Sequence, residues 1–364
     1  MAVPLRLDRL VVRGFRNLAD LDLTPGPRFN VLSGDNGQGK SNLLEAIHYV
    51  VALRSFRLAG TDDLIAHGAE AAVLAARFGA EPTPIDAKIR LERGRARSVS
   101  LHGKRPRSSA AWIASLHTVL FHPGDLSLAS GSPEHRRAYL DRILEQMDPT
   151  YASTSAAYTK ALRSRNRLLK ADTPDRRSVR AYDGLLAEAG AVIGAARSSL
   201  TEELKPLAER GFAEVAGQEI PLAVDYAPRV APRVDAIRAA LERSIDKDFA
   251  RGFTAEGPHA DDLKLSVRTR GARHHASQGQ HRMMVLALKV AELEVLARRV
   301  DRAPILLLDD VSSELDRTRN ERFFAFLDRL GAQVFLTTTH REFIRVDHDR
   351  VDFTVSAGRV TPAA

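Results

Sequence analysis

Hydrophobic and polar residues alternate along the first third of the chain, as they do in strands that bury one face. Turns rich in glycine and proline interrupt this pattern near Gly14 and Pro25. Residues 29–32 form a mainly apolar run, and a helical pattern follows over 41–47. The order predicts a β-meander, then a short buried strand, a loop and a helix. The alternating segments that we expect to be strands are 5–7, 10–12, 21–23, 71–78, 87–91 and 98–101.

The middle of the chain has the spacing of apolar residues that is typical of helices. Ser132 is expected to cap a helix that has Pro133 at its first position. Two longer helices, over 151–171 and 177–200, flank a break at 172–175, which predicts an αα-hairpin. Beyond the hairpin we expect a helix over 232–249 and strands at 220–226, 252–254 and 263–267.

The last third combines one strongly apolar helix with two apolar strands. A turn at 277–282 leads into a helix over 283–296. A strand at 304–308 ends in two carboxylates, and a second strand at 333–337 is followed by Thr338, Thr339 and His340. Polar residues directly after buried strands are candidates for a site at one edge of a sheet.

Composition indicates an ordinary globular protein of two or three domains. The chain has 364 residues, of which 44% are hydrophobic and 27% charged. It has no cysteine, which excludes disulfides and thiolate metal sites and is compatible with a reducing cytoplasm. No run of about 18 apolar residues predicts a membrane span, and the first residues lack the apolar core of a signal peptide. We therefore expect a cytoplasmic protein without a membrane partner.

The net charge of +8 suggests an acidic partner, nucleic acid first, although a diffuse excess of arginine is the alternative. The cations cluster near the tip of the αα-hairpin, with only Asp172 and Asp175 among them. A nucleic-acid patch is favoured there over a solvated charged face. A basic turn at 102–107 is interpreted as a hairpin tip rather than a DNA contact. The hairpin cations predicted to bind DNA are Arg163, Arg165, Arg167 and Lys170.

An octapeptide after the first buried strand matches the phosphate-loop pattern G-x-x-x-x-G-K-S/T. Its glycines let the backbone curl so that N–H groups converge on phosphate oxygens, and the next helix directs its positive end at the anion. Lys40 is expected to reach the β and γ phosphates of ATP, and Ser41 to bind Mg²⁺. The predicted nucleotide-binding residues are Gly34, Asp35, Asn36, Gly37, Gln38, Gly39, Lys40, Ser41 and Asn42.

The carboxylates at the end of the strand over 304–308 complete this prediction, because a Walker B strand carries an acid to the Mg²⁺ beside a phosphate loop. Asp309 is predicted to bind Mg²⁺, and Asp310 to orient or deprotonate the attacking water. His340 is placed to bond the γ phosphate. With Lys40, these are the predicted catalytic residues. The Ser277–Gln280 turn offers further N–H donors to an anion, although a capped helix is the commoner explanation of such a turn when it is taken alone.

These motifs, in this order, resemble the ATP-binding-cassette heads of the SMC group and, within that group, the RecF family. The resemblance implies an α/β ABC-type, SMC-like ATPase head with an inserted helical arm. We expect the head to comprise residues 1–125 and 270–364, and the arm residues 126–269. The stretches that carry the resemblance are residues 34–47, 55–57, 131–141, 257–263, 277–282 and 306–316.

The resemblance also implies functions that the residues alone do not show. RecF-like proteins form an ATP-dependent homodimer, bind double-stranded DNA and double-strand to single-strand junctions, and act with RecO and RecR in recombination, replication, DNA repair and the SOS response to damage. Ser277, Gly279 and Gln280 would then contact the γ phosphate held by the partner subunit. Asp316 would lie at the dimer seam. Within the arm, the resemblance adds Arg136 and Arg137 to the predicted DNA contacts.

Two features depart from the family pattern, namely Gly124 in place of an acid and Ala260 in place of an arginine. The second puts a role for the turn at 257–262 in doubt. Because Asp310 is shorter than the glutamate of fast cassette ATPases, we expect slow turnover, below about 10 s⁻¹. The alternative is a transporter-type or translation-type cassette ATPase that does not bind DNA. A nuclease fused to a cassette is disfavoured, since no separate acidic metal cluster is evident.

Overall fold

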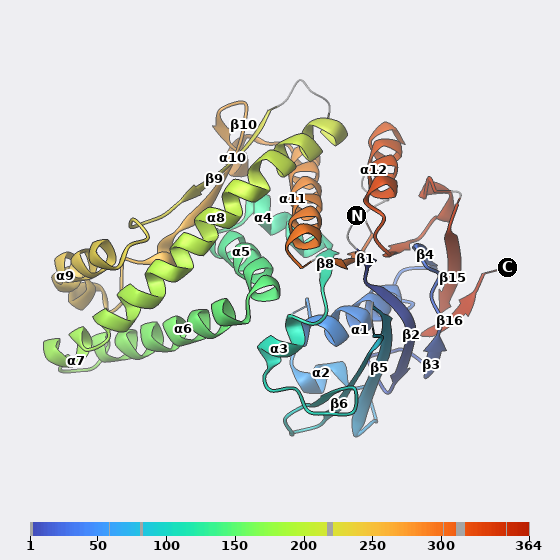
Figure 1. The fold of residues 1–364 in the computed structure, drawn as a ribbon, viewed down its shortest axis with the longest axis horizontal. Coiled ribbons are helices and arrows are strands. Elements are labelled where there is room, and N and C mark those ends of the chain that lie inside the picture. Colours follow the sequence, from blue (N-terminus) through green and yellow to red (C-terminus); the bar gives the residue numbers. More distant parts are fainter. Residues whose placement is uncertain are drawn as a thin grey trace. The chain divides into compact units, whose positions relative to one another are not determined.

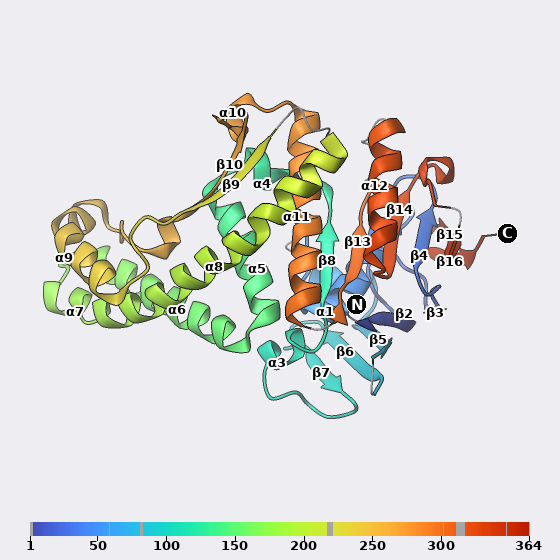
Figure 2. The ribbon, with the colours of Figure 1, turned by 45° about the horizontal axis from the view of Figure 1, so that its top comes forward.

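The computed structural model describes residues 3–57, 59–80, 83–216, 221–300, 302–310, 317–346 and 348–363. The chain divides into two compact units (Figures 1 and 2). The first unit comprises Met1–Asp125, Glu214–Ala216 and Lys289–Ala364, and the second comprises Leu126–Ala213 and Gly217–Leu288. Asp316, predicted to lie at a dimer seam, falls outside the described residues.

The first unit contains most of the strands and a helix, α1 (Lys40–Ala52), that follows the phosphate loop. Its other helices are α2 (Thr61–Leu64), α3 (Ser109–Ile113), α12 (Arg317–Leu330) and the last turns of α11 (Gln278–Arg299). Its strands are β2 (Arg6–Arg13), β3 (Leu21–Leu23), β4 (Phe29–Ser33), β5 (Ala71–Gly79), β6 (Ile85–Glu92), β7 (Ser98–Leu101), β8 (Thr118–Phe121), β13 (Ile305–Leu308), β14 (Val334–Thr338), β15 (Arg350–Ser356) and β16 (Arg359–Pro362), with β1 (Val3–Pro4) paired to β12 (Arg302–Ala303).

Two sheets of different character build this unit. The six-stranded sheet has the order β16-β15-β4-β14-β13-β8, and all its pairs except β15–β16 are parallel. Figure 2 shows β8, β13, β14 and β4 in succession. These four strands are buried along their whole length, as expected of a parallel sheet covered on both faces. The antiparallel sheet has the order β3-β2-β5-β6-β7.

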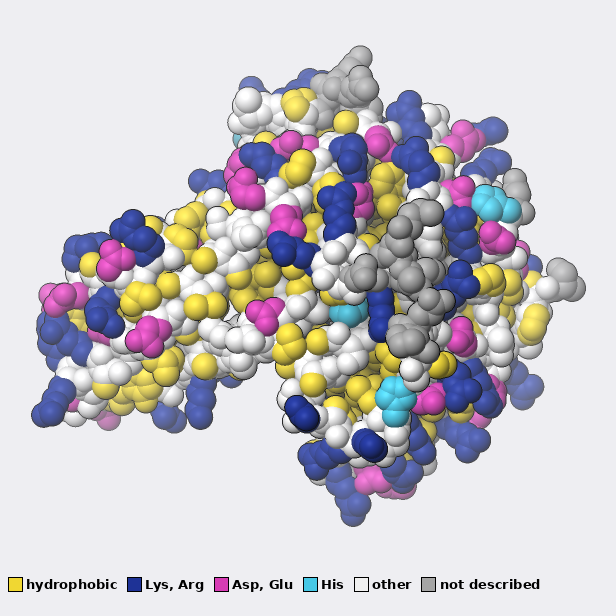
Figure 3. Space-filling model, in the orientation of Figure 1, with side chains coloured by type: hydrophobic (Ala, Val, Ile, Leu, Met, Phe, Trp, Pro, Cys, Tyr) yellow, Lys and Arg dark blue, Asp and Glu magenta, His cyan; other side chains and the backbone are white. Residues whose placement is uncertain are grey.

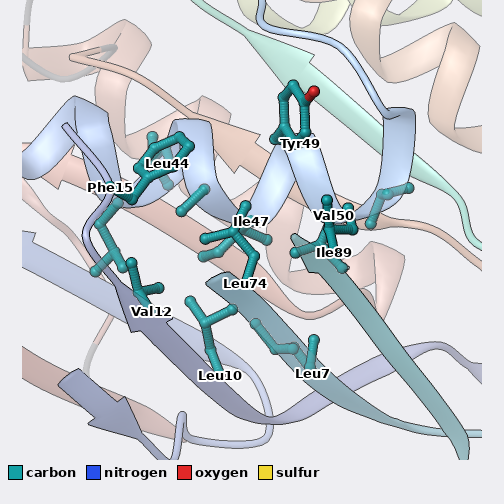
Figure 4. Close-up of a cluster of buried hydrophobic side chains, with 14 of the residues drawn as sticks. Leu7, Leu10, Val12, Phe15, Leu44, Ile47, Tyr49, Val50, Leu74 and Ile89 are labelled. Carbon is teal, nitrogen blue, oxygen red and sulfur yellow. The ribbon is translucent and has the colours of Figure 1, made fainter. Parts of the chain in front are cut away.

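The core of the first unit lies around α1. Strands β5 and β6 alternate buried and exposed side chains, so one face of the antiparallel sheet is apolar. Figure 4 shows Leu10, Leu74 and Ile89 from that sheet packed against Leu44 and Ile47 of α1. All five side chains are fully buried. The helix that begins at the phosphate loop is therefore fixed by hydrophobic contacts along its length.

The second unit is mainly helical. Its helices are α4 (Ser127–Ser130), α5 (Pro133–Met147), α6 (Pro149–Leu169), α7 (Arg176–Arg180), most of α8 (Asp183–Ala216), α9 (Val234–Arg251), α10 (Ala272–His275) and the first turns of α11 (Gln278–Arg299). An antiparallel sheet of order β11-β10-β9 completes it, with β9 (Leu222–Ala227), β10 (Asp262–Val267) and β11 (Arg270–Gly271).

The structure corrects several expectations from the sequence. The expected strands at 5–7 and 10–12 are largely one strand, β2. Strand β4, expected as a buried strand after the meander, pairs with β14 and β15. The helix expected over 177–200 is two helices, α7 and the longer α8. The expected strand at 252–254 is not formed, because the backbone N–H and hydroxyl of Thr254 donate to Asn166 Oδ1. Ser132 precedes α5, but its side chain makes no capping hydrogen bond to the helix backbone.

In the part of the chain that the structure describes, no helix is both long enough and apolar enough to span a membrane.

Candidate nucleotide-binding site

The phosphate loop lies between β4 and the N-terminus of α1, as the sequence predicted. Gly34 has φ +156°, and a Cβ atom there would lie 2.2 Å from the Val355 carbonyl oxygen of β15. Only glycine therefore fits between the loop and the neighbouring strand. Because α1 begins at Lys40, its unpaired backbone N–H groups face the space enclosed by the loop, where a phosphate would be stabilised.

A turn between β15 and β16 holds the loop from the other side. The Ala357 N–H donates to Gln38 Oε1 at 2.6 Å, and the Gly358 N–H donates to the Gln38 carbonyl oxygen at 2.9 Å. Gly358 has φ +77°, and a Cβ there would lie 2.0 Å from the Asn17 carbonyl oxygen. The Gln38 side chain, predicted to bind nucleotide, thus acts as a clamp on the loop in this structure.

Lys40 is buried and donates from Nζ to the carbonyl oxygens of Gly34 at 2.5 Å and Asp35 at 2.8 Å. Burial lowers the pKa of its ammonium group, while the charges of Asp310 and Asp309 oppose this shift. Both carboxylates therefore lie close enough to Lys40 to act on it electrostatically. The ammonium group already occupies the mouth of the loop, where it can meet phosphate oxygens.

Asp309 follows β13 and lies beside the phosphate loop. Ser41 donates from its hydroxyl to Asp309 Oδ1 at 2.7 Å, and Thr337 of β14 donates to the same oxygen at 2.8 Å. The parallel pairing of β13 with β14 sets this arrangement, because it aligns the carboxyl ends of both strands. Two residues 268 positions apart are thus brought together as a hydroxyl–carboxylate pair.

This pair fits Mg²⁺, a hard cation that takes oxygen ligands from one or two protein groups together with phosphates and water. Among the described residues, no group of three His, Cys, Asp or Glu side chains could hold a metal by itself. Ser41 and Asp309 would therefore hold the ion jointly with the nucleotide. The donor set matches the two metal ligands that the sequence predicted.

Asp310 and His340 occupy different surroundings. Asp310 has φ +53°, and its backbone N–H donates to Thr337 Oγ1 at 2.9 Å, so one hydroxyl fixes both Asp309 and Asp310. A non-glycine residue with positive φ costs energy and is found at functional sites more often than elsewhere. His340 follows β14 with an exposed ring that lies 3.2 Å from Glu342. Its role at the γ phosphate stays a prediction.

Three residues near the loop were not predicted from the pattern. Thr337 lies in β14, which is buried along its whole length, so no alternation of buried and exposed residues distinguishes it from its neighbours. Asn17 donates to the Gly37 carbonyl oxygen at 3.3 Å and accepts from Asn42 Nδ2 at 2.6 Å. Arg57 donates to Asn42 Oδ1 at 2.6 Å. Asn42, predicted to bind nucleotide, therefore links the loop to Asn17 and Arg57.

The Ser277–Gln280 turn lies in the second unit and forms a reciprocal capping box at the start of α11. The Ser277 N–H donates to Gln280 Oε1 at 2.8 Å, and the Gln280 N–H donates to Ser277 Oγ at 3.2 Å. A Cβ atom added at Gly279 would have no other atom within 4 Å. In this structure the side chains of Ser277 and Gln280 accept the hydrogen bonds at the N-terminus of α11 that the sequence analysis assigned to a phosphate.

The predicted DNA contact at Arg165 is wrong. Its guanidinium is fully buried and donates to Asp183 at 3.0 Å, Asp248 at 2.8 Å and the Thr254 hydroxyl at 2.7 Å. These partners come from α8, α9 and the segment after α9, so Arg165 holds the second unit together. A side chain with no solvent-accessible surface cannot reach a DNA phosphate.

Arg136 is likewise a structural residue, which corrects its predicted DNA role. It donates to both carboxylate oxygens of Asp262, at 2.7 and 3.1 Å, and is buried. Arg137 is half-buried and donates to the Asp261 carbonyl oxygen at 2.7 Å, and burial lowers its pKa. The turn at 257–262 thus receives hydrogen bonds from both Arg136 and Arg137 of α5. Ala260 in the same turn is exposed, so an arginine there would extend into solvent.

The remaining predicted DNA contacts are exposed. Arg163 and Arg167 lie one helical turn apart on α6 and line a groove of about 570 Å³ with Lys160 and Glu145. Lys170, at the C-terminal end of α6, is also exposed. Arg163, Arg167 and Lys160 form no ion pair with the described residues. We refer to this groove, lined also by Ala152, Ser155, Ala156, Thr159 and Ser164, as the α6 groove.

Comparison with known proteins bears on these features. The family model described as RecF/RecN/SMC N terminal domain matches residues 6–361. The chain is 41% identical to the DNA replication and repair protein RecF of Anaeromyxobacter sp. (strain Fw109-5), over 98% of this chain and 99% of that protein. It is 38% identical to RecF of Myxococcus xanthus, over 94% and 92% of the two chains.

Two solved structures are similar. The recombination mediator protein RecF with bound ATPrS, described as part of the RecFOR pathway, has a TM-score of 0.90 at 30% identity and covers 100% of this chain and 99% of that one. The Smc head domain of Pyrococcus furiosus has a TM-score of 0.61 at 16% identity, covering 99% and 96%, and supports the fold alone.

The two sheets, the phosphate loop and the Ser41–Asp309 pair define an α/β ATPase head of the ABC type that SMC and RecF proteins share. The predicted fold class is therefore confirmed. The chain belongs to the RecF family, within the wider RecF/RecN/SMC group.

Proposed function

We propose that this protein is an ATP-dependent, DNA-binding recombination mediator. In this proposal it dimerises on ATP, binds DNA at single-strand gaps or double-strand to single-strand junctions, and helps RecO and RecR to load a recombinase. The observation that carries the proposal is the phosphate loop beside Asp309, with Ser41 bonded to Asp309 Oδ1 at 2.7 Å, in a chain whose relatives are named RecF. The ATP-bound state of a similar structure supports the choice of nucleotide.

At the nucleotide, the loop N–H groups and Lys40 bind the phosphates, and α1 adds the positive end of its dipole. Ser41 and Asp309 would hold Mg²⁺, which when bound would neutralise phosphate charge. Asp310 orients the attacking water and accepts its proton. The bonds from Lys40 Nζ to the Gly34 and Asp35 carbonyl oxygens exchange for bonds to phosphate as the nucleotide enters. We expect slow hydrolysis that resets the protein rather than metabolic turnover.

For dimerisation, Ser277 and Gln280 meet the γ phosphate held by a second copy. The capping box now occupies the N–H groups of both residues. A phosphate oxygen can replace these side-chain acceptors, because it is a stronger, charged acceptor at a helix N-terminus. The exchange makes helix α11 sensitive to nucleotide in the partner.

For DNA binding, Lys160, Arg163 and Arg167 contact phosphates along the α6 groove. The three cations share one helix face and form no ion pair with described residues. Their charges are therefore available to replace counterions on a duplex. Such contacts carry no sequence preference, which suits a protein that acts at gaps in any sequence.

The test is the mass of the protein in solution with and without ATP and with a DNA duplex carrying a single-strand gap. Wild type is expected to become a dimer only with ATP and to retain DNA in that state. Lys40→Arg should remain monomeric, since the planar guanidinium does not reproduce the ammonium in the loop. Replacing Lys160, Arg163 and Arg167 by Gln should leave dimerisation intact and weaken DNA binding at least about tenfold.

A matched control removes the same charge elsewhere in the second unit, by replacing Arg238, Arg243 and Arg251, which are also exposed, by Gln. This control should bind DNA within about twofold of wild type. A wild-type protein that stays monomeric with ATP and does not bind the gapped duplex contradicts the mediator proposal. It would favour an ATPase of the transporter or translation type, which needs no DNA.

A further inference from the structure

The outward face of β6 and β7 forms a second basic surface, in the first unit. The two strands pair so that Lys88 lies opposite Ser100 and Arg90 opposite Ser98. The intervening residues of β6 point into the core, so Lys88 and Arg90 share the exposed face. After β7 the chain turns tightly at His102 and Gly103, both with positive φ, and runs back along this face.

This segment and the two strands enclose a concavity of about 880 Å³. We refer to it as the β6–β7 concavity. Among the described residues that line it are five cations and four serines, and no Asp or Glu. The lining residues are Lys88, Arg90, Arg97, Arg105, Arg107, Ser98, Ser100, Ser108 and Ser109, with Ala96, Val99, Gly103 and Pro106.

The carboxylates nearest in sequence to the lining cations already form ion pairs with arginines. Asp86, on the same face of β6, accepts two bonds from Arg77 of β5, at 2.8 and 3.2 Å. Glu92 accepts from Arg90 at 2.5 Å and from Arg95 at 3.1 Å. These pairs leave three cations of the lining without an ion pair to any described residue, namely Lys88, Arg105 and Arg107. Lys and Arg side chains gather over this end of β6 in Figure 3.

We propose that the β6–β7 concavity binds the sugar–phosphate backbone of duplex DNA, which reverses the interpretation from the sequence that the turn at 102–107 does not contact DNA. Cations and hydroxyl groups are the side chains that contact phosphate and sugar oxygens. No aromatic residue is present among the described lining, which disfavours the stacking of unpaired bases. The proposal rests on the proposed DNA-binding function and adds a contact site in the ATPase unit, separate in sequence from the α6 groove.

The floor of the concavity is tied to the helix of the phosphate loop. Arg97 donates to the Leu53 carbonyl oxygen and, at 3.4 Å, to the Tyr49 hydroxyl. Leu53 caps the C-terminal end of α1, where a cation is favoured by the helix dipole. Helix α1 thus follows the phosphate loop at its N-terminus. At its C-terminus it accepts a hydrogen bond from Arg97, which lines the concavity. DNA held there would rest on the element that binds nucleotide.

The test compares duplex binding by two variants of the full-length protein with equal charge loss. The site variant carries Lys88→Gln, Arg105→Gln and Arg107→Gln. The control carries Arg6→Gln, Arg13→Gln and Arg322→Gln, which change exposed cations of the same unit. Fluorescence anisotropy of a labelled 30-base-pair duplex is measured with ATP over a range of salt concentrations. The site variant should bind at least about tenfold more weakly, and its log–log salt slope should fall by about 2 to 3, since each phosphate contact contributes about 0.9.

A second measurement follows the accessibility of Lys88 to an amine-modifying reagent, with Lys264 of the second unit as reference. Duplex DNA should protect Lys88 but not Lys264. A site variant with wild-type affinity and slope, or Lys88 that stays fully reactive on DNA, overturns the proposal. Protection by polyglutamate but not by the duplex reassigns the surface to an acidic protein. If the wild-type protein binds no duplex, the proposed DNA-binding function itself is contradicted. If wild type, the control variant and the site variant all bind the duplex equally well, only the proposal for the β6–β7 concavity is contradicted.

Discussion

At the scale of single residues, the hydroxyl of Thr337 connects the carboxylate of Asp309 to the backbone N–H of Asp310. It donates to Asp309 Oδ1 at 2.8 Å and accepts from the Asp310 N–H at 2.9 Å. The sequence predicted the carboxylates, because an apolar strand that ends in two acids is a local pattern. It did not predict Thr337, since the pairing of β13 with β14 decides which residue stands beside them.

Thr337→Val tests this connection. The substitution keeps the shape of a buried side chain and removes both hydrogen bonds, so Asp309 and the Asp310 N–H lose a partner. We expect the free energy of unfolding to fall by about 1–3 kcal/mol and the rate of ATP hydrolysis to fall by about tenfold or more. Urea unfolding and single-turnover kinetics measure the two effects. Thr118→Val, in β8 of the same sheet, should change stability but not the hydrolysis rate.

His259 gives a residue-scale prediction about pH. Its Nε2 donates to the Thr254 carbonyl oxygen at 2.9 Å and its Nδ1 accepts from the Tyr158 hydroxyl at 2.7 Å. Burial lowers the pKa of this imidazole, although the Thr254 bond opposes the shift. The unfolded chain, with a histidine pKa of about 6.5, binds the proton more readily than the folded chain. Stability is therefore lost as pH falls below about 6.5.

The measurement is the free energy of unfolding from pH 8 to pH 5. His259→Gln should be less stable than wild type at pH 8 but should lose less stability on acidification, by at most about 1.4 kcal/mol per pH unit. His67→Gln, at an exposed position, should leave the wild-type slope unchanged. Equal slopes for wild type and His259→Gln would show that this histidine is not held neutral.

At the scale of elements, one face of helix α6 is exposed in the α6 groove and another is buried within the second unit. Arg163 and Arg167 are exposed in the α6 groove, while Arg165 is buried between them in sequence. A helix turns by about 100° per residue, so alternate residues point in different directions. The sequence showed a run of cations but could not show which face is covered. The acids that bury Arg165, Asp183 and Asp248, are 18 and 83 positions away.

Arg165→Met should therefore affect folding and not DNA affinity alone. Removing one partner of a buried ion pair leaves Asp248 charged and buried, which costs about 3–5 kcal/mol. Thermal or urea unfolding should show this loss, whereas Arg163→Met on the exposed face should change stability by less than about 0.5 kcal/mol. A stable Arg165→Met protein that has lost only DNA binding would contradict the structural role of this arginine.

At the scale of the whole molecule, local patterns predicted most helices and strands but not how the strands are shared between sheets. Alternation of polar and apolar residues identified β5 and β6, and a continuous apolar run identified β14. It identified β4 as a buried strand but not its partners, because these, β14 and β15, come late in the chain. The candidate site divides in the same way. Residues that belong to a motif were found, including the distant pair Ser41 and Asp309, whereas contacts that no motif marks, such as those of Thr337 and Asn17, were not.

The clamp on the phosphate loop has a consequence for biosynthesis. The loop occupies residues 34–41, but the turn that holds Gln38 is formed by Ala357 and Gly358. Strand β4, which leads into the loop, pairs only with β14 and β15 in the six-stranded sheet. A nascent chain therefore exposes its nucleotide motif early and gives it this shape only after residue 358 has left the ribosome. We therefore expect nucleotide binding only after β15 has paired with β4 and the turn after β15 holds Gln38.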